Sequence, residues 1–283
     1  MIIDSGLHSF RILGAPEHIK KALVELYGRT DERKFADFQI RLNRNGLRKF
    51  LKPQVSIEIE GQQPFNPVPP EKLLPSIEWA MNWCVAAYEH NHLLIHASVV
   101  ERNNKSIIFP AQSGSGKSTL STYLALNGWH LFYDEMAVID LKSQKTIPIF
   151  RPSSLKNESI NIIAGLKKPI NMSDVTVETH KGAIAHVMPH TRKIYQSLSP
   201  CKPCAVISIS YRQGCNTEIV ELDKAVGMSS MLLNAFNYSV IGSSAFDSMV
   251  ELSNSVRFFE VTYSNMQDLA LFLAELVNGS VDG

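Results

Sequence analysis

Hydrophobic and polar positions in the first part of the chain predict a small mixed module. Apolar residues at residues 35–42 and 55–60 alternate with polar ones at a period of two, which predicts half-exposed strands. A short helix is expected before them, over residues 17–27. Prolines are frequent in residues 62–70, as is typical of an extended linker. We therefore expect residues 1–70 to form a small N-terminal α+β module with its linker.

The remaining residues, 71–283, show the longer apolar runs of a larger α/β domain. The runs predict strands at residues 93–100, 106–110, 129–133, 136–141, 146–150 and 205–210. Polar turns join the first two of these strands into one hairpin, and the strands at 136–141 and 146–150 into a second hairpin. Helical spacing of apolar residues predicts helices at residues 73–89, 117–126 and 269–277.

The charged residues are almost balanced, with 28 Lys and Arg against 27 Asp and Glu among 283 residues. Such a balance predicts neither general nucleic-acid binding nor attachment to a membrane surface. No run of about 20 apolar residues occurs that would span a bilayer. The first ten residues also lack the pattern of a signal peptide. We expect a cytoplasmic protein that binds neither nucleic acid nor a membrane.

The chain has four cysteines, too few for a disulfide scaffold. Cys201 and Cys204 have the spacing of a redox motif, and with Cys215 they would offer three thiolates to a metal. They precede a predicted strand, whereas a redox motif of this kind opens a helix. We interpret them as loop cysteines beside a buried strand.

A glycine-rich stretch, Ala-Gln-Ser-Gly-Ser-Gly-Lys-Ser-Thr, fills residues 111–119 between a predicted strand and a predicted helix. This context is typical of a phosphate-binding loop, whose backbone N–H groups converge on an anion at a helix N-terminus. Alanine replaces the first glycine of the usual pattern, but strand, loop and helix agree too well for a fortuitous loop. The residues expected to bind nucleotide phosphates are Ser113, Gly114, Ser115, Gly116, Lys117, Ser118 and Thr119. Among them, Lys117 would contact the outer phosphates and Ser118 would bind Mg²⁺.

Asp134 is expected to lie beside this loop. The predicted helix leads roughly 15 Å away from the phosphates, and the strand after Gly128 returns by about that distance. A carboxylate there would hold Mg²⁺ through water or accept the proton of an attacking hydroxyl. The alternative, a solvated acidic turn, explains less of this geometry.

Four further residues have two open interpretations each. His96 lies in the predicted strand before the loop-bearing strand, where it could face the phosphates or Asp134, or simply be a packed histidine. Arg151, Lys156 and Lys181 occupy turn-like positions flanked by glycine or proline. They could stabilise the negative charge of phosphoryl transfer or be solvated surface cations.

These residues resemble those of a known family. His96, the Ser-Gly-x-Gly-Lys-Ser loop and the pair Asp134–Glu135 look like the catalytic core of HPr kinase/phosphorylase. Over most of residues 70–283 the chain is similar to the HPr-kinase-related kinases, the HprK-related kinase A group. The resemblance implies an α/β P-loop domain of the HPr kinase/phosphoenolpyruvate carboxykinase type.

The resemblance also implies roles for individual residues. The loop would bind ATP, Asp134 would activate the acceptor hydroxyl, Glu135 and Ser118 would lie at Mg²⁺, and His96 would stand beside them. Lys156 and Lys181 become stronger candidates for catalytic cations, and a homo-oligomer is suggested.

The chain also departs from the HPr kinase pattern. Glu135 replaces an aspartate, Ala97 replaces a glycine, and the Glu-x-Arg-Gly-x-Gly stretch of HPr kinases is not found downstream of Asp134. HPr as the acceptor and the reverse phosphorolysis therefore do not follow from the resemblance.

The leading prediction is an ATP- and Mg²⁺-dependent kinase that transfers the γ-phosphate to a hydroxyl, preferably of serine, on a protein or peptide. Two alternatives stay open: a small-molecule kinase, and a nucleotide-binding regulatory module without catalysis. The predicted position of Asp134 favours catalysis, and the lack of a basic tract argues against a nucleic-acid motor. No motif names the acceptor or assigns a role to residues 1–70.

Overall fold

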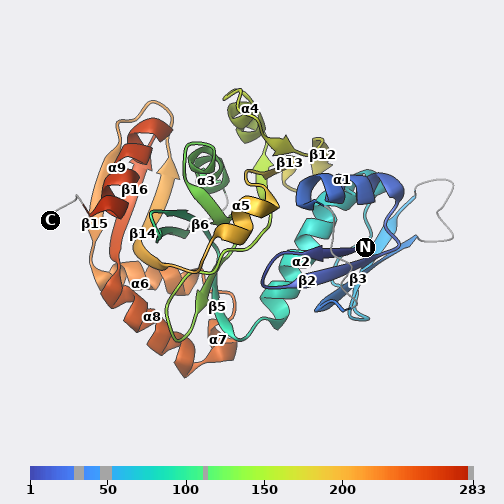
Figure 1. Ribbon diagram of the computed structural model, residues 1–283, viewed down its shortest axis with the longest axis horizontal. Coiled ribbons are helices and arrows are strands. Elements are labelled where there is room, and N and C mark those ends of the chain that lie inside the picture. Colours follow the sequence, from blue (N-terminus) through green and yellow to red (C-terminus); the bar gives the residue numbers. More distant parts are fainter. Residues whose placement is uncertain (29–34, 45–52, 111–113, 280–283) are drawn as a thin grey trace. The chain divides into compact units, whose positions relative to one another are not determined.

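The computed structural model describes residues 1–28, 35–44, 53–110 and 114–279, and the chain forms two compact units (Figure 1). The first unit contains Met1–Tyr88 and Ile149–Met188, and the second contains Glu89–Pro148 and Pro189–Gly283. This division differs from the predicted boundary at residue 70. The reason is that helix α2 (Leu73–Tyr88) packs on strands of the first unit, and the chain later returns to that unit.

The N-terminal sheet of the first unit has the strand order β1-β2-β3-β4. Its strands are β1 (Ile2–Asp4), β2 (Ser9–Leu13), β3 (Phe38–Arg44) and β4 (Val55–Ile59). β2 and β3 are parallel and the other pairs are antiparallel. Helix α1 (Glu17–Tyr27) buries Ile19, Leu23 and Leu26, which share one helical face. The helix predicted at 17–27 and the strand predicted at 55–60 are confirmed, whereas the strand predicted at 35–42 begins only at Phe38.

A second sheet in the first unit comes from residues after Ile149. Its central strand is β13 (Gly182–Met188), which pairs antiparallel with three shorter strands. These are β10 (Ser153–Lys156), β11 (Asn171–Met172) and β12 (Thr176–Thr179). Helix α4 (Glu158–Ala164) follows β10, and a short 3-10 helix, η2 (Pro70–Lys72), precedes α2.

The second unit is built on a sheet of the order β15-β16-β14-β7-β6-β8 among its described residues. The strands are β6 (Ala97–Arg102), β7 (Lys105–Pro110), β8 (His130–Tyr133), β14 (Lys202–Tyr211), β15 (Glu218–Leu222) and β16 (Arg257–Tyr263). β5 (His92–Ile95) and β9 (Ala137–Asp140) form a separate antiparallel pair. The helices are α3 (Lys117–Ala125), α5 (Arg192–Ser197), α6 (Lys224–Leu233), α7 (Tyr238–Ile241), α8 (Ser243–Ser255) and α9 (Met266–Asn278).

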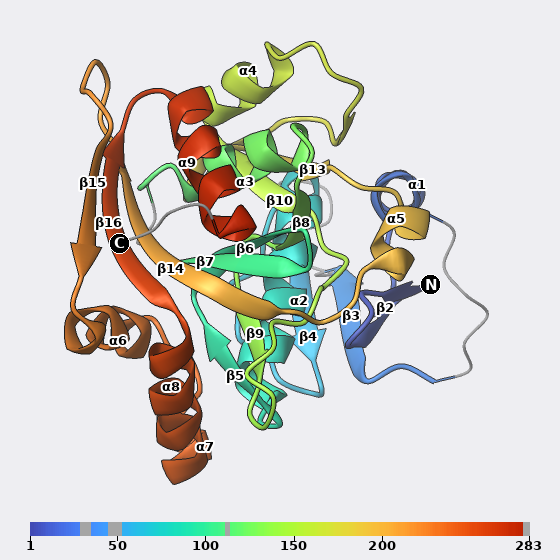
Figure 2. The same cartoon turned by 60° about the vertical axis from the view of Figure 1, so that its left-hand side comes forward.

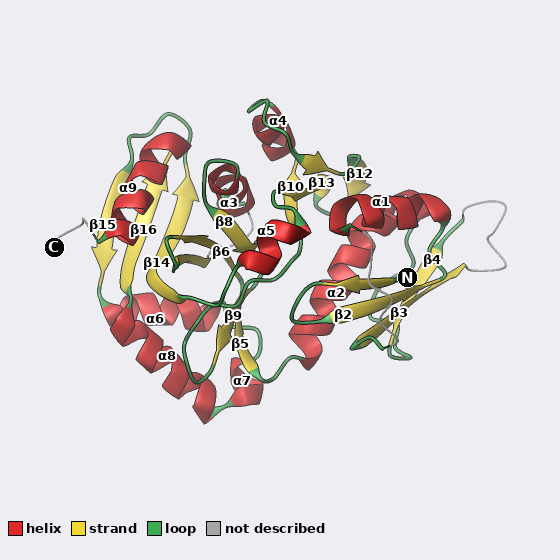
Figure 3. Ribbon diagram, in the orientation of Figure 1, coloured by secondary structure: helices red, strands yellow, loops and turns green. Residues whose placement is uncertain are grey.

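Helices cover both faces of this sheet, which explains the continuous apolar runs of its strands. In β7, Ile107 and Phe109 pack with α3 and α9, whereas Ile108 between them packs with α6 and α8. Figure 2 shows α3 and α9 on one side of the sheet and α6 and α8 on the other. The fold is therefore mixed α/β, as Figure 3 shows by secondary structure. Within the described part of the chain, no helix is long and apolar enough to cross a membrane.

The direction of the strands places four carboxyl ends at one edge of the sheet. β7, β14 and β16 are mutually parallel. β6 is antiparallel to both β7 and β8, so β8 runs in the same direction as β7. The segments that follow β7, β8, β14 and β16 therefore all begin at the same edge.

One sequence prediction about strands was wrong, and another is confirmed only in part. The strand predicted at 93–100 is divided at His96 into β5 and β6, which belong to different sheets. The hairpin predicted over 136–141 and 146–150 forms only as a short contact: Asp140 N–H donates to the Lys145 carbonyl at 3.0 Å and Ile147 N–H to the Val138 carbonyl at 2.9 Å. Beyond Ile147 the chain leaves β9, which pairs along its length with β5. Thr146 N–H donates to the Cys201 carbonyl at 2.9 Å, so a distant segment meets the same turn.

Candidate functional site

The glycine-rich stretch lies where β7 ends and α3 begins. Gly114 and Gly116 have φ angles of 95° and 92°, in the left-handed region that favours glycine. Gly116 immediately precedes α3, and its carbonyl accepts a hydrogen bond from Leu120 N–H at 2.9 Å. The helix N-terminus therefore faces the edge at which the strand ends, which suits it to bind an anion. Ser113 lies outside the described residues.

Two tyrosines from neighbouring strands support this stretch. Tyr211 ends β14 and Tyr263 ends β16, and Tyr211 N–H donates to the Ser115 carbonyl at 3.1 Å. A Cβ atom on Gly116 would lie 2.9 Å from Tyr263 Oη and 3.1 Å from Tyr211 Cβ, too close without a shift. Burial raises the pKa of Tyr263, so its hydroxyl stays protonated. No sequence pattern indicated either tyrosine, because only strand pairing brings them to the loop.

Lys117 and Ser115 bring polar groups to this edge. Lys117 is the first residue of α3 and is only 7% exposed, although lysine is seldom buried. Ser115 Oγ is buried without a hydrogen-bond partner among the described residues. Ser118 and Thr119 occupy the next two positions of α3. A buried hydroxyl lacking a partner beside a buried cation is an arrangement that an anionic oxygen would satisfy.

Asp134 reaches the same edge from β8, as the helix and strand lengths predicted. It follows the last residue of that strand and is completely buried. Ser121 of α3 donates a hydrogen bond from Oγ to Asp134 Oδ1 at 3.1 Å. The acid is therefore linked to the helix that begins at the glycine-rich stretch.

His96 lies between β5 and β6 and faces Glu135. His96 Nε2 is 3.7 Å from Glu135 Oε2, and both side chains are partly exposed. The backbone N–H of His96 donates to the Asn234 carbonyl at 2.7 Å, and its ring lies 5.6 Å from that of Phe236, centroid to centroid. The contact with Glu135 gives this histidine a defined acidic neighbour, which the sequence left open.

Asn237 holds the segment around His96 and was missed by sequence reasoning. It is 1% exposed, and its Oδ1 accepts a hydrogen bond from Leu94 N–H at 3.0 Å. Its Nδ2 donates to the carbonyls of Glu89 and His92, at 2.8 Å each. These bonds connect residues far apart in the sequence, so no local pattern could have indicated them.

The three other predicted cations belong to the first unit, outside the unit that carries the glycine-rich stretch. Arg151 is buried and pairs with Glu78, so it is committed to a structural contact. Lys181 lies over the Trp79 ring, with Nζ 5.6 Å from the centroid. Lys156 ends β10. The catalytic roles of Lys156 and Lys181 stay predictions.

Three of the four cysteines are buried or half-buried thiols that are harder to ionise than a free thiol. Burial raises the pKa of Cys201, and it raises the pKa of Cys204 to about 11 and that of Cys84 to about 12. Among the described residues, no group of three or more His, Cys, Asp or Glu side chains is arranged to hold a metal ion. Cys204 lies within β14 rather than in a loop, and Cys201 bridges to Thr146 just before that strand.

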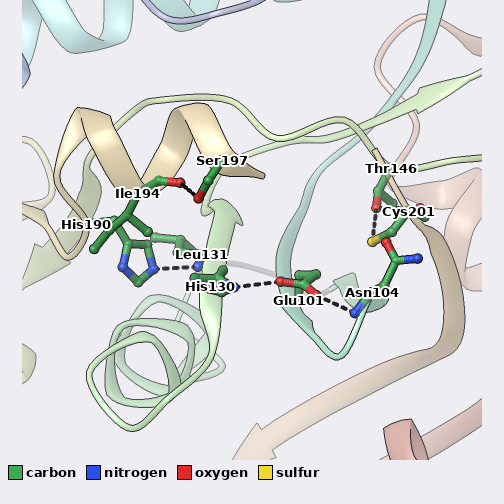
Figure 4. A network of polar contacts seen from close by, with 9 residues as sticks. All are labelled: Glu101, Asn104, His130, Leu131, Thr146, His190, Ile194, Ser197 and Cys201. Atoms are coloured by element: carbon green, nitrogen blue, oxygen red, sulfur yellow. Dashed lines mark hydrogen bonds and ion pairs between the residues drawn. The ribbon is translucent and has the colours of Figure 1, made fainter. Parts of the chain in front are cut away.

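A further polar network joins β6, β8 and the segment before α5 (Figure 4). His130 Nδ1 and Glu101 Oε2 are 2.7 Å apart, and Asn104 N–H donates to Glu101 Oε1 at 2.6 Å. His190 Nε2 accepts a hydrogen bond from Leu131 N–H at 2.9 Å. Burial and the neighbouring His130 lower the pKa of His190 to about 4. These contacts link β6 to β8, and β8 to the segment before α5.

Comparison with known proteins adds no relative: no family model matches the chain, and a search of curated proteins finds no match.

Proposed function

We propose that the chain is an ATP-dependent phosphotransferase whose nucleotide site is this sheet edge, in a P-loop domain of the HPr kinase/phosphoenolpyruvate carboxykinase type. One observation carries the proposal. Helix α3 begins at the glycine turn after β7, and Asp134 at the end of β8 is hydrogen-bonded to Ser121 of that same helix. An anion-binding helix terminus and a buried acid therefore lie together, as phosphoryl transfer requires.

The residues divide the chemistry as follows. Backbone N–H groups of residues 114–119 and the Lys117 ammonium bind the β- and γ-phosphates. Asp134 accepts the proton of the acceptor hydroxyl. At the same time the oxygen of that hydroxyl bonds to the γ-phosphorus, and the bond between the γ-phosphorus and the β–γ bridging oxygen breaks. ADP leaves, and the phosphate stays on the acceptor. Ser121 orients the Asp134 carboxylate for this step.

Two residues near the proposed phosphate site, Ser118 and Glu135, suit a magnesium ion. The Ser118 hydroxyl and the Glu135 carboxylate are oxygen donors, the kind that Mg²⁺ prefers, and this ion usually takes few protein ligands beside phosphates and water. A larger cluster of acidic or histidine ligands is therefore not required. When bound, Mg²⁺ would neutralise charge on the phosphates.

The acceptor in this proposal is a hydroxyl, preferably of serine, on a protein or peptide. Residues 129–139, around Asp134, contain neither an Arg nor a Gln that would position a water molecule. Such groups accelerate hydrolysis in dedicated NTPases. We therefore expect slow hydrolysis of ATP alone and faster transfer when the acceptor completes the site.

The test compares Lys117→Ala with Lys105→Ala, a lysine at the opposite end of β7. Each purified protein is incubated with Mg²⁺, γ-labelled ATP and cell extract, and labelled products are identified. We expect Lys117→Ala to lose at least about 10³-fold in transfer while it stays folded, because the transferring phosphate loses its cation. Lys105→Ala should behave as wild type.

Three outcomes would contradict the proposal. Unchanged phosphate transfer by folded Lys117→Ala would exclude this sheet edge as the nucleotide site. Hydrolysis without acceptor at about 1 s⁻¹ or faster would indicate an ATPase. ATP binding without turnover under any condition would indicate a regulatory module instead.

A further inference from the structure

Residues 225–246 contain no charged residue, although 19% of the chain is charged. These residues form nearly all of α6, all of α7 and the beginning of α8. An uncharged stretch is ordinary in a buried core, where desolvating a charge is costly. On these helices, however, it coincides with exposure to solvent.

Five large apolar side chains of this stretch face solvent. Val226, near the start of α6, is 55% exposed. The four from residue 233 onward are Leu233 at 88%, Val240 at 64%, Phe246 at 46% and Phe236 at 45%. The same helices bury other side chains, such as Met231 and Met249, against the sheet, so the exposed ones lie on outward faces. We call the four from residue 233 onward the apolar acceptor surface. They lie within 14 residues of chain that carry no charge, and exposed apolar surface of this kind is typical of interaction sites.

One member of this surface, Phe236, lies beside the proposed catalytic edge. Phe236 lies against His96, with 5.6 Å between ring centroids, and its N–H donates to the Leu94 carbonyl at 2.9 Å. His96 in turn faces Glu135 at 3.7 Å. A molecule placed on Phe236 would therefore be next to the groups proposed to handle phosphate.

We propose that the apolar acceptor surface binds the phosphoacceptor, and that this acceptor is a polypeptide with apolar side chains flanking its hydroxyl residue. The inference rests on the proposed function and specifies its acceptor. A polar metabolite would not bind more tightly by covering Leu233 or Val240. Apolar side chains of a peptide would, because the free energy of binding becomes more favourable in proportion to the apolar area buried. The stretch also lacks the Lys and Arg that draw proteins to anionic membranes.

The experiment measures binding separately from transfer. Two fluorescein-labelled peptides carry one serine each, flanked in the first by Leu and Phe and in the second by Asn and Gln at the same positions. Their affinities are measured by anisotropy for the wild type and for Leu233→Ser/Val240→Ser. The control is Leu271→Ser/Val220→Ser, which removes the same residue types at 62% and 55% exposure from α9 and β15 of the same unit.

We expect the wild type and the control to bind the apolar peptide at least about tenfold more tightly than the polar one. The Leu233→Ser/Val240→Ser variant should lose this preference, while its affinity for a fluorescent ATP analogue stays unchanged. Transfer from γ-labelled ATP to the apolar peptide should fall in parallel.

Several results would overturn the inference. One is equal binding of both peptides by the wild type, and another is an equal loss of binding in both double variants. Dissociation of an oligomer caused by Leu233→Ser/Val240→Ser alone, seen by light scattering, would assign the surface to a second copy of the chain. Sedimentation of the wild type with phosphatidylcholine vesicles would assign it to a membrane. Surface-dependent binding of the apolar peptide without transfer to any acceptor would instead refute the proposed function and leave the surface as a peptide-binding site.

Discussion

Two groups of buried charged side chains, one in each unit, differ in their surroundings. In the first unit, Arg151 Nη2 lies 2.7 Å from Glu78 Oε2 and donates to the Glu78 backbone carbonyl at 3.0 Å. Tyr27 Oη donates to the same carboxylate at 2.9 and 3.0 Å. In the second unit, Lys117 and Asp134 are buried beside a glycine turn, a helix N-terminus and the carboxyl ends of strands.

Burial of charge alone therefore does not identify a functional site. The contacts of Glu78 link α1, α2 and the segment before β10, so the ion pair fixes packing inside one unit. The contacts of Asp134 and Ser115 lie instead at a sheet edge where backbone groups can meet a ligand. We expect substitutions in the first cluster to change stability, and those in the second to change catalysis or ligand affinity.

Asp134→Asn should show the largest effect on catalysis. The amide keeps the shape and the bond from Ser121 but cannot take a proton, so transfer should fall by about 10²–10⁴-fold while ATP affinity is retained. Asp140→Asn, at the end of β9, is the control. Pre-steady-state transfer and equilibrium binding of an ATP analogue separate the two effects. A parallel loss of binding and turnover would make Asp134 a metal ligand rather than a base.

Arg151→Met should show the largest effect on stability. It leaves the Glu78 carboxylate buried without its cation, and such a change costs about 3–5 kcal/mol in free energy of unfolding. The double variant Glu78→Gln/Arg151→Met removes both charges, keeps an acceptor for Tyr27 and should recover most of that loss. Urea unfolding at neutral pH measures all three proteins. A cost below about 1 kcal/mol for Arg151→Met would show that the pair contributes no more than a surface salt bridge.

Gly116→Ala should weaken ATP binding by roughly 10–100-fold, because it combines a left-handed backbone angle with the contact to Tyr263 Oη. Gly128→Ala has a similar φ of 89° but nothing within 4 Å of its Cβ, so it should cost stability without changing ATP affinity. Removing the hydroxyl in Gly116→Ala/Tyr263→Phe should restore part of the binding. Equal ATP affinity of the two glycine variants would argue against a ligand at this turn.

The smallest predicted effect concerns His190, whose pKa of about 4 lies below its ordinary value. Between the two values the unfolded chain binds a proton that the folded chain does not, so stability falls as pH drops from about 6.5 towards 4 and is retained above 6.5. The slope from this group is at most about 1.4 kcal/mol per pH unit. His190→Asn can still accept from Leu131 N–H and should flatten the profile in urea unfolding. An identical pH profile in the variant would contradict this assignment.

Local patterns predicted many of the elements but not their partners. The helix expected at 117–126 is observed as Lys117–Ala125, and the strand expected at 129–133 as His130–Tyr133. The helix expected at 269–277 begins earlier, at Met266, because Asn265 caps it by accepting a hydrogen bond from Gln267 N–H at 2.8 Å. The strand expected at 93–100 is instead two strands separated at His96. The division was not visible in the sequence, because the apolar run continues where the chain passes from one sheet to the other.

The same division holds for the candidate site. The glycine turn and the position of Asp134 were predictable, because helix rise and strand rise fix where a short strand after a helix returns. Tyr211, Tyr263, Ser121 and Asn237 were not, since each meets its partner through strand pairing or packing of distant segments.

The sequence by itself therefore determined the periodicities, the glycine-rich turn and the mixed α/β class, all of which depend on residues close together in the chain. Only the tertiary structure decided that residues 149–188 join the first unit, that β5 pairs with β9, and that His96 faces Glu135. The physical reason is that backbone hydrogen bonds and apolar faces can be satisfied by many partners. The choice among them depends on the free energy of the whole packed unit.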